Sequence, residues 1–154
     1  MGYVIPTADS ITALLAMIFG DGLGVGSADA DDLGGQHVAT FVNPEDQLVA
    51  LCACDKPFVA YSGAALSMIP ADVANEMING GEVSEAMVGN FYEVMNICSK
   101  LMMRDGSAHL RLHQTLEPGQ AADAIATLNG KAEAKTFGID IPRYGSGKLT
   151  FLIT

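Results

Sequence analysis

The first part of the chain alternates between a helical pattern of apolar residues and a glycine-rich stretch without one. The segment 9–19 predicts an amphipathic helix that begins after Thr7 or Asp9 and ends at Gly20. Its apolar stripe consists of Ile11, Leu14, Leu15 and Ile18. We expect this helix to be mostly buried. The stretch 20–35 that follows has no regular pattern and predicts an exposed loop.

Three runs with extended character come next. They cover 36–42, 47–54 and 57–68. Short turn signals separate them, at Asn43-Pro44 and at Asp55-Lys56. Since consecutive strands joined by short turns pair with each other, these runs predict an antiparallel meander.

The second half of the chain returns to mixed helices and strands. The predicted elements are a short helix at 71–78, a long helix at about 82–103, a strand at 108–116, a short helix at 118–128, and strands at 131–141 and 148–154. Strands in runs with helices between them are typical of α+β proteins. We therefore expect one domain over 1–154, with about six mostly antiparallel strands and helices packed on the sheet.

Composition and charge exclude several classes of partner. Of the 154 residues, 49% are hydrophobic and 17% charged, which is typical of a globular chain with a sizeable core. The net charge is −10, and the eight basic residues are spread along the chain, so we expect neither nucleic acid nor an anionic membrane as a partner. The apolar stretch 11–19 is too short to span a bilayer and has no features of a signal peptide, so we expect a cytoplasmic protein.

Cysteines and histidines do not form a recognisable metal site. Cys52 and Cys54 alternate along an extended run and Cys98 lies in the long helix, which favours buried free thiols. The three histidines show no zinc-type spacing with them: His37, His109 and His113. We expect no metal and no cofactor bound by this chain.

The long helix carries two faces of different character. Its apolar stripe consists of Val83, Met87, Phe91, Val94, Cys98 and Leu101. Its polar stripe consists of Glu85, Gly89, Glu93, Asn96 and Lys100. Glu93 and Asn96 are three positions apart, so their side chains are neighbours, and a carboxylate beside a carboxamide can bind a cation and orient a water. The alternative is that this stripe is only the solvated face of an amphipathic helix.

The sequence Glu93-Val94-Met95-Asn96 in a long helix resembles the E-x-x-N signature of the CheC, CheX and FliY proteins. Pro118 follows Asn96 by 22 positions, one short of the usual spacing to the proline of that family. The run 58–66, followed by a short helix, also looks like the strand before the signature helix. The helix at 9–19 contains neither Glu nor Asn, so only one site is expected, as in CheX.

The resemblance implies a phosphatase that removes the aspartyl phosphate from a CheY-like response regulator in bacterial chemotaxis or two-component signalling. It implies that Asn96 positions the attacking water, that Glu93 contacts a lysine of the partner, and that Mg²⁺ belongs to the partner. Glu85, Gly89 and Lys100 are expected to contact the partner. Gly89 and Lys100 depart from the family, which often has Asp or Ser at the first position and a small residue at the second.

Two other functions stay open at this point. The chain is either such a phosphatase or a non-catalytic CheC-like interaction module that binds a response regulator or a flagellar or signalling component. An unrelated globular domain that binds a small molecule in a pocket is the third alternative. The strand edges of a six-stranded sheet could also pair in a homodimer.

Overall fold

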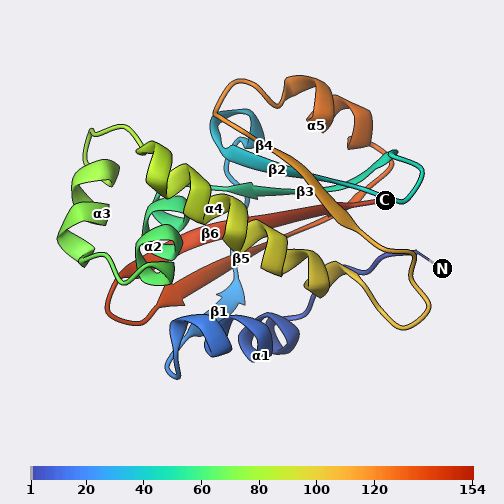
Figure 1. Cartoon of the computed structure of the whole chain (residues 1–154). Coiled ribbons are helices and arrows are strands. Elements are labelled where there is room, and N and C mark those ends of the chain that lie inside the picture. Colours follow the sequence, from blue (N-terminus) through green and yellow to red (C-terminus); the bar gives the residue numbers. More distant parts are fainter. Residues whose placement is uncertain (1) are drawn as a thin grey trace.

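Six strands form one sheet, and every neighbouring pair in it is antiparallel. The structure is a computed structural model that describes residues 2–154 (Figure 1). In chain order the strands are β1 (Gly24–Ser27), β2 (His37–Val42), β3 (Leu48–Cys54), β4 (Arg111–Leu116), β5 (Glu133–Ile141) and β6 (Gly145–Ile153). Their order across the sheet is β1-β5-β6-β3-β2-β4, so β1 and β4 are the edges. The predicted α+β class is confirmed.

Helices cover both faces of this sheet. The α-helices are α1 (Ala8–Phe19), α2 (Lys56–Leu66), α3 (Ala71–Ile78), α4 (Glu85–Cys98) and α5 (Ala122–Leu128), and the 3₁₀ helices are η1 (Leu33–Gly35) and η2 (Ser99–Met102). The main core lies between one face and α1, α2 and α4, and a smaller core lies under α5 on the other face. In the described part of the chain, no helix has both the length and the apolar character needed to cross a bilayer.

Alternation along β3 assigns its residues to the two cores. Cys52 and Cys54 point into the main core, whereas Leu51 and Ala53 point into the core under α5. All three cysteines are buried and free, as predicted. Burial raises the pKa of the Cys98 thiol to about 12, so this thiol stays protonated and inert at neutral pH.

The prediction of a third strand at 57–68 is wrong, because most of this segment belongs to the helix α2. Asp55 caps this helix, because its Oδ1 accepts hydrogen bonds from the backbone N–H of Phe58 and of Lys148, each at 2.9 Å. Pro57 lies in the first turn, where a missing N–H costs nothing. The helix is apolar on most sides because it packs between β6, α3 and α4, so its residues lack the one-sided pattern of a surface helix.

Two glycines allow α2 to approach its neighbours closely. A Cβ on Gly147 of β6 would lie 2.4 Å from the backbone nitrogen of Phe58. A Cβ on Gly63 would lie 3.0 Å from Sδ of Met87 in α4. Both distances are shorter than ordinary van der Waals contacts, so these positions need the absence of a side chain.

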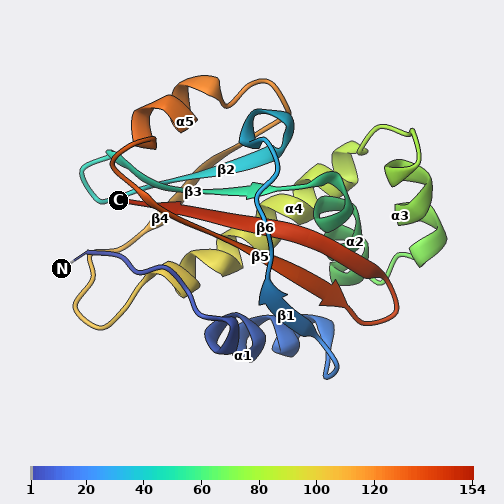
Figure 2. The ribbon, with the colours of Figure 1, turned by 180° about the vertical axis from the view of Figure 1, so that it is seen from behind.

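The predicted loop at 20–35 contains a strand that the sequence pattern missed. Residues Gly24–Ser27 pair with β5 as the edge strand β1. The chain then crosses the sheet on the side of α5 before it enters β2 (Figure 2). Lys148 holds this crossing, because its Nζ donates to the carbonyl oxygen of Asp29 at 3.0 Å and to Oδ1 of Asp31 at 3.3 Å.

The remaining differences concern the limits of elements. The helix predicted at 82–103 is shorter, since α4 begins after the N-cap Ser84, ends at Cys98 and is followed by η2. The helix at 9–19 is present, but only Ile11 and Leu15 are fully buried in it, so the expectation of a mostly buried helix is wrong. The last strand begins at Gly145 and not at 148, because the turn before it is tighter than predicted.

Candidate functional site

The helix α4 is fixed to the molecule by its apolar side. Ser84 begins the helix, and its Oγ accepts a hydrogen bond from the backbone N–H of Met87 at 3.3 Å. The fully buried residues of the helix are Met87, Phe91, Val94, Met95 and Cys98. These residues include most of the predicted apolar stripe, while Val83 lies before the helix and is only half-buried. The predicted packing side of α4 is therefore confirmed.

A second contact fixes the rotation of α4 about its own axis. Nδ2 of Asn90 donates to the carbonyl oxygen of Gly63 at 2.9 Å and to Oγ of Ser67 at 2.8 Å. Both acceptors belong to α2 or to its C-cap, and Gly63 is also where the two helices approach closely. Nothing in the spacing of residues indicated this role for Asn90. The side of α4 that faces away from the core is therefore held in a fixed orientation.

That opposite side presents the predicted polar stripe to solvent. All five of its residues are exposed: Glu85, Gly89, Glu93, Asn96 and Lys100. The two ion pairs found in residues 2–154 do not include Glu93, and neither its carboxylate nor the carboxamide of Asn96 has a hydrogen-bond partner there. The structure therefore brings Glu93 and Asn96 together on a rigid support and leaves the polar groups of both side chains available.

Within the described residues, Lys100 forms no ion pair with Glu93 and no hydrogen bond to Asn96. It belongs to η2, past the end of α4, and it lines an apolar groove of about 550 Å³ between α1 and η2. Met17 of α1 lines the same groove and is 84% exposed.

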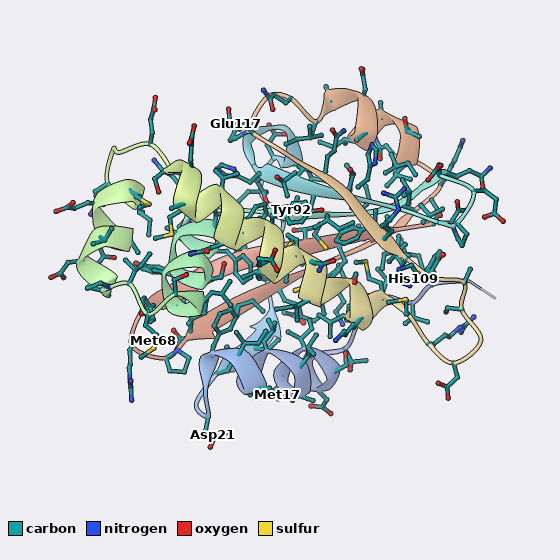
Figure 3. The ribbon with its side chains drawn as sticks, in the orientation of Figure 1. Met17, Asp21, Met68, Tyr92, His109 and Glu117 are labelled. Carbon is teal, nitrogen blue, oxygen red and sulfur yellow. The ribbon has the colours of Figure 1, made fainter. Side chains whose placement is uncertain are left out.

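Tyr92 belongs to this surface and was missed in the sequence. Its ring is 39% exposed, and it precedes Glu93 directly, on the edge of the polar stripe that faces β4 (Figure 3). Exposed tyrosine and methionine side chains are enriched where proteins bind each other. Its position one residue from Glu93, about 100° around the helix, was the signal that could have identified it.

Pro118 lies far from Asn96 in sequence but close to the first turns of α4. It stands in the connection between β4 and α5, and it lines a cavity together with Val88 of α4. The structure thus places Pro118 beside the helix that carries the E-x-x-N segment.

Comparisons by sequence find neither a matching family model nor a matching curated protein. Comparisons by structure find FliY of Thermotoga maritima, with a TM-score of 0.64 and 13% identity over 94% of this chain and 82% of that chain. They also find the crystal structure of a FliM–SpeE complex from H. pylori, with a TM-score of 0.61 and 8% identity over 95% of this chain and 80% of that one. This chain has the CheC-like fold.

The similarity shows the CheC-like fold, and the identities are too low to show more. The crystal structure of the CheX–CheY–BeF₃–Mg²⁺ complex from Borrelia burgdorferi also matches, with a TM-score of 0.46 and 14% identity over 94% of this chain and 93% of that chain. At this score the match supports no conclusion. The expected closeness to CheX within the CheC-like fold is therefore not confirmed.

Proposed function

We propose that this CheC-like protein binds a phosphorylated CheY-like receiver domain through α4 and hydrolyses its aspartyl phosphate. One observation carries the proposal. Glu93 and Asn96 are exposed, neighbours on α4, and their polar groups have no partner in the described chain. They lie on a helix whose rotation about its own axis is fixed by Asn90. The fixed rotation of α4 holds both groups toward solvent, where a partner can reach them.

The roles of the two residues follow from their chemistry. The carboxamide of Asn96 can both donate and accept hydrogen bonds, so it can hold a water in line with the phosphorus atom of a bound acyl phosphate. The carboxylate of Glu93 accepts hydrogen bonds only, which suits a lysine of the receiver domain. The receiver supplies Mg²⁺. Catalysis then consists of positioning and electrostatic stabilisation, as in other phosphoryl transfers, and it needs no nucleophile from this chain.

Exposed residues around the pair would add contact area. Tyr92 lies beside Glu93, and Glu85 and Gly89 continue the stripe toward the start of α4. The chain carries a net charge of −10, so it offers no long-range attraction to a partner that is also acidic. Association with such a partner should therefore depend on local contacts, and added salt should not weaken it as it weakens complexes between oppositely charged proteins.

The experiment that tests the proposal measures the decay of phosphorylated receiver domains from the same genome, with and without the purified protein. Wild type should accelerate the decay of at least one receiver, and Asn96→Ala should remove the acceleration. Asn129→Ala is the matched control, since Asn129 is exposed beyond α5 and far along the chain from α4. If no receiver is dephosphorylated faster, or if Asn96→Ala is as active as wild type, the proposed reaction is wrong.

The matches to FliM, with TM-scores above 0.5, favour a second function. FliM of H. pylori was also solved in a FliG–FliM complex, which matches with a TM-score of 0.55 and 9% identity over 95% of this chain and 85% of that one. A protein with this fold therefore forms a complex with FliG, and this chain would likewise bind a flagellar or signalling component, without catalysis. In that case the protein would bind its partner with equal affinity whether or not the partner is phosphorylated, and no turnover would be measured.

A further inference from the structure

A cavity lies beside the first half of α4, away from the Glu93–Asn96 pair. Its volume is about 370 Å³, at the small end of the range for sites that hold small molecules. Four segments meet around it: the start of β2, the start of α2, the connection before α4, and the connection between β4 and α5. Glu117, on the last of these segments, lies near the start of α4 in Figure 3.

The most unusual group in this cavity is the imidazole of His37. The residue is only 9% exposed, and its ring packs edge-on against Phe91 of α4 with 6.1 Å between ring centroids. No hydrogen bond to a ring nitrogen of His37 occurs within residues 2–154, although the ring lines the cavity. The ring nitrogens are not among the buried polar atoms that lack a partner in residues 2–154, so they are open to the cavity, where a ligand could hydrogen-bond them.

Desolvation fixes the protonation state of this imidazole. Burial lowers the pKa of His37 below its ordinary value of 6.5, while Glu117 raises this pKa and Lys56 lowers it to smaller extents. The ring is therefore neutral at pH 7, with one nitrogen that donates and one that accepts. The opposed effects of Glu117 and Lys56 also show that both charges lie within electrostatic reach of the ring.

Charges of both signs line the cavity, and they come from different segments. Nζ of Lys56 donates to the carbonyl oxygen of Gly81 at 2.6 Å, which holds the ammonium in place and leaves it further protons to donate. Glu117 and Glu82 supply carboxylates from the two connections. A ligand that carries one positive and one negative group could satisfy both kinds of charge.

The remaining part of the lining is apolar. Val83, Val88 and Pro118 contribute aliphatic surface without polar side-chain atoms. Such surface binds a small aliphatic group by excluding water from it. The lining thus combines a cation, an anion, a neutral hydrogen-bonding ring and an apolar patch.

We propose that this cavity binds a small zwitterion of the α-amino acid class with an apolar side chain. Its carboxylate would contact Lys56, its ammonium would contact Glu117, and its side chain would lie against Val83 and Val88. His37 would hydrogen-bond the polar end of the ligand. A ligand with only a carboxylate would leave Glu117 without a partner, and one with only an amine would leave Lys56 without one.

The first experiment is calorimetric titration of the full chain with L-valine, L-leucine and L-methionine. Each amino acid is compared with two analogues of leucine that lack one charge, 4-methylpentanoate and 3-methylbutylamine. At least one amino acid should bind about tenfold more tightly than either analogue, because both charges contribute. The ring signals of His37 should shift in NMR spectra on titration with that amino acid. The proposal is overturned if none of the three binds, or if an analogue binds as tightly.

Substitutions test the assigned contacts. Glu117→Gln and Lys56→Met should each weaken binding of the amino acid about tenfold, whereas Lys56→Arg, which keeps the charge, should retain most of the affinity. Glu45→Gln and Lys131→Met are matched controls at exposed positions away from the cavity. Glu117 is exposed, so Glu117→Gln tests the site even if a change at Lys56 impairs folding. Wild-type affinity in Glu117→Gln would overturn the assignment.

Discussion

The helices α1 and α4 pack on the same face of the sheet, yet only α4 carries the Glu93–Asn96 pair that we propose as the site. Both begin with a hydroxyl N-cap, Thr7 in α1 and Ser84 in α4, and both turn an apolar side toward the main core. The exposed side of α1 carries no carboxamide and no glutamate, whereas that of α4 carries both. Amphipathic packing therefore explains why each helix exists, and the exposed groups decide which of them can do chemistry.

The two helices also differ in how their exposed sides are fixed. In α1 the side chains of Thr7 and Ser10 form a capping box, so polar groups near its start serve the helix itself. In α4 the polar groups that serve the structure are Ser84, which caps the helix, and Asn90, which contacts α2 and not the exposed stripe. The side chains of Glu93 and Asn96 have no such structural contact within the described residues.

The largest effect is expected from Asn96→Ala. Loss of the carboxamide should slow dephosphorylation of the receiver about 100-fold, because the attacking water loses its orientation. The unfolding free energy should stay near that of wild type, since the side chain is exposed. Turnover at saturating receiver and urea unfolding measure the two quantities. A rate equal to that of wild type would remove the catalytic distinction between α4 and α1.

Gly63→Val should disturb the packing of α4 on α2. The new side chain would collide with Met87 across the contact of α2 and α4, and overpacking of this kind costs about 2 kcal/mol of unfolding free energy. The matched control is Gly89→Ala on the exposed side of α4, where a Cβ meets nothing within 4 Å. That change should stabilise the protein by up to about 1 kcal/mol, because alanine favours the helix. Equal destabilisation by both changes would contradict the packing described for α2 and α4.

Glu93→Ala should act mainly on binding. Removal of the contact to a lysine of the partner should weaken the complex with an activated receiver about tenfold, which corresponds to about 1.4 kcal/mol. Glu76→Ala on α3 is the control, since Glu76 is exposed outside the stripe. Calorimetric titration gives both affinities. Equal affinities for the two variants would mean that Glu93 lies outside the interface.

His37, which packs on Phe91 of α4, should have a smaller, pH-dependent effect on the unfolding free energy. Burial lowers the pKa of His37 in the folded chain below its ordinary 6.5, while Glu117 opposes this shift and Lys56 adds to it. Below pH 6.5 the unfolded chain therefore binds a proton that the folded chain resists, and unfolding free energy is lost as the pH falls through the folded pKa. Denaturation at several pH values should show this loss, and His37→Gln should reduce it. His113→Gln, at an exposed position, should leave it unchanged.

Substitutions on the exposed side of α1 should have the smallest effect on turnover. Asp9→Ala and Met17→Ala should change turnover at saturating receiver by less than about twofold, because exposed substitutions away from a site have little effect. The same decay assay measures it. A large loss of turnover with unchanged stability would show that α1 also carries catalytic groups.

The sequence was informative where one side of an element faces solvent. The stripe of α4 and the helix at Ala8–Phe19 follow from such patterns, and the exposure of Glu93 and Asn96 agrees with them. It was misleading where an element is surrounded. The helix α2 has β6, α3 and α4 around it, so its apolar run imitated a buried strand, although Asp55 and Pro57 were signals of a helix start.

Other features depend on contacts that no local pattern reveals. The strand β1 has the sequence Gly-Val-Gly-Ser, which favours a loop, and it is extended because β5 pairs with it. The cavity around His37 joins residues from 35 to 118, so it exists only after the chain has folded. The bracing by Asn90 likewise requires knowledge of which helix lies next to α4.

The most direct test of the central claim is NMR titration of the labelled protein with a beryllofluoride-activated receiver domain and with the same receiver left unmodified. The account predicts tighter binding of the activated form, with the carboxamide signals of Asn96 among the most strongly perturbed and the exposed residues of α1 little affected. Equal affinity for the two forms, or perturbations that omit Asn96, would contradict the assignment of the site to the exposed side of α4.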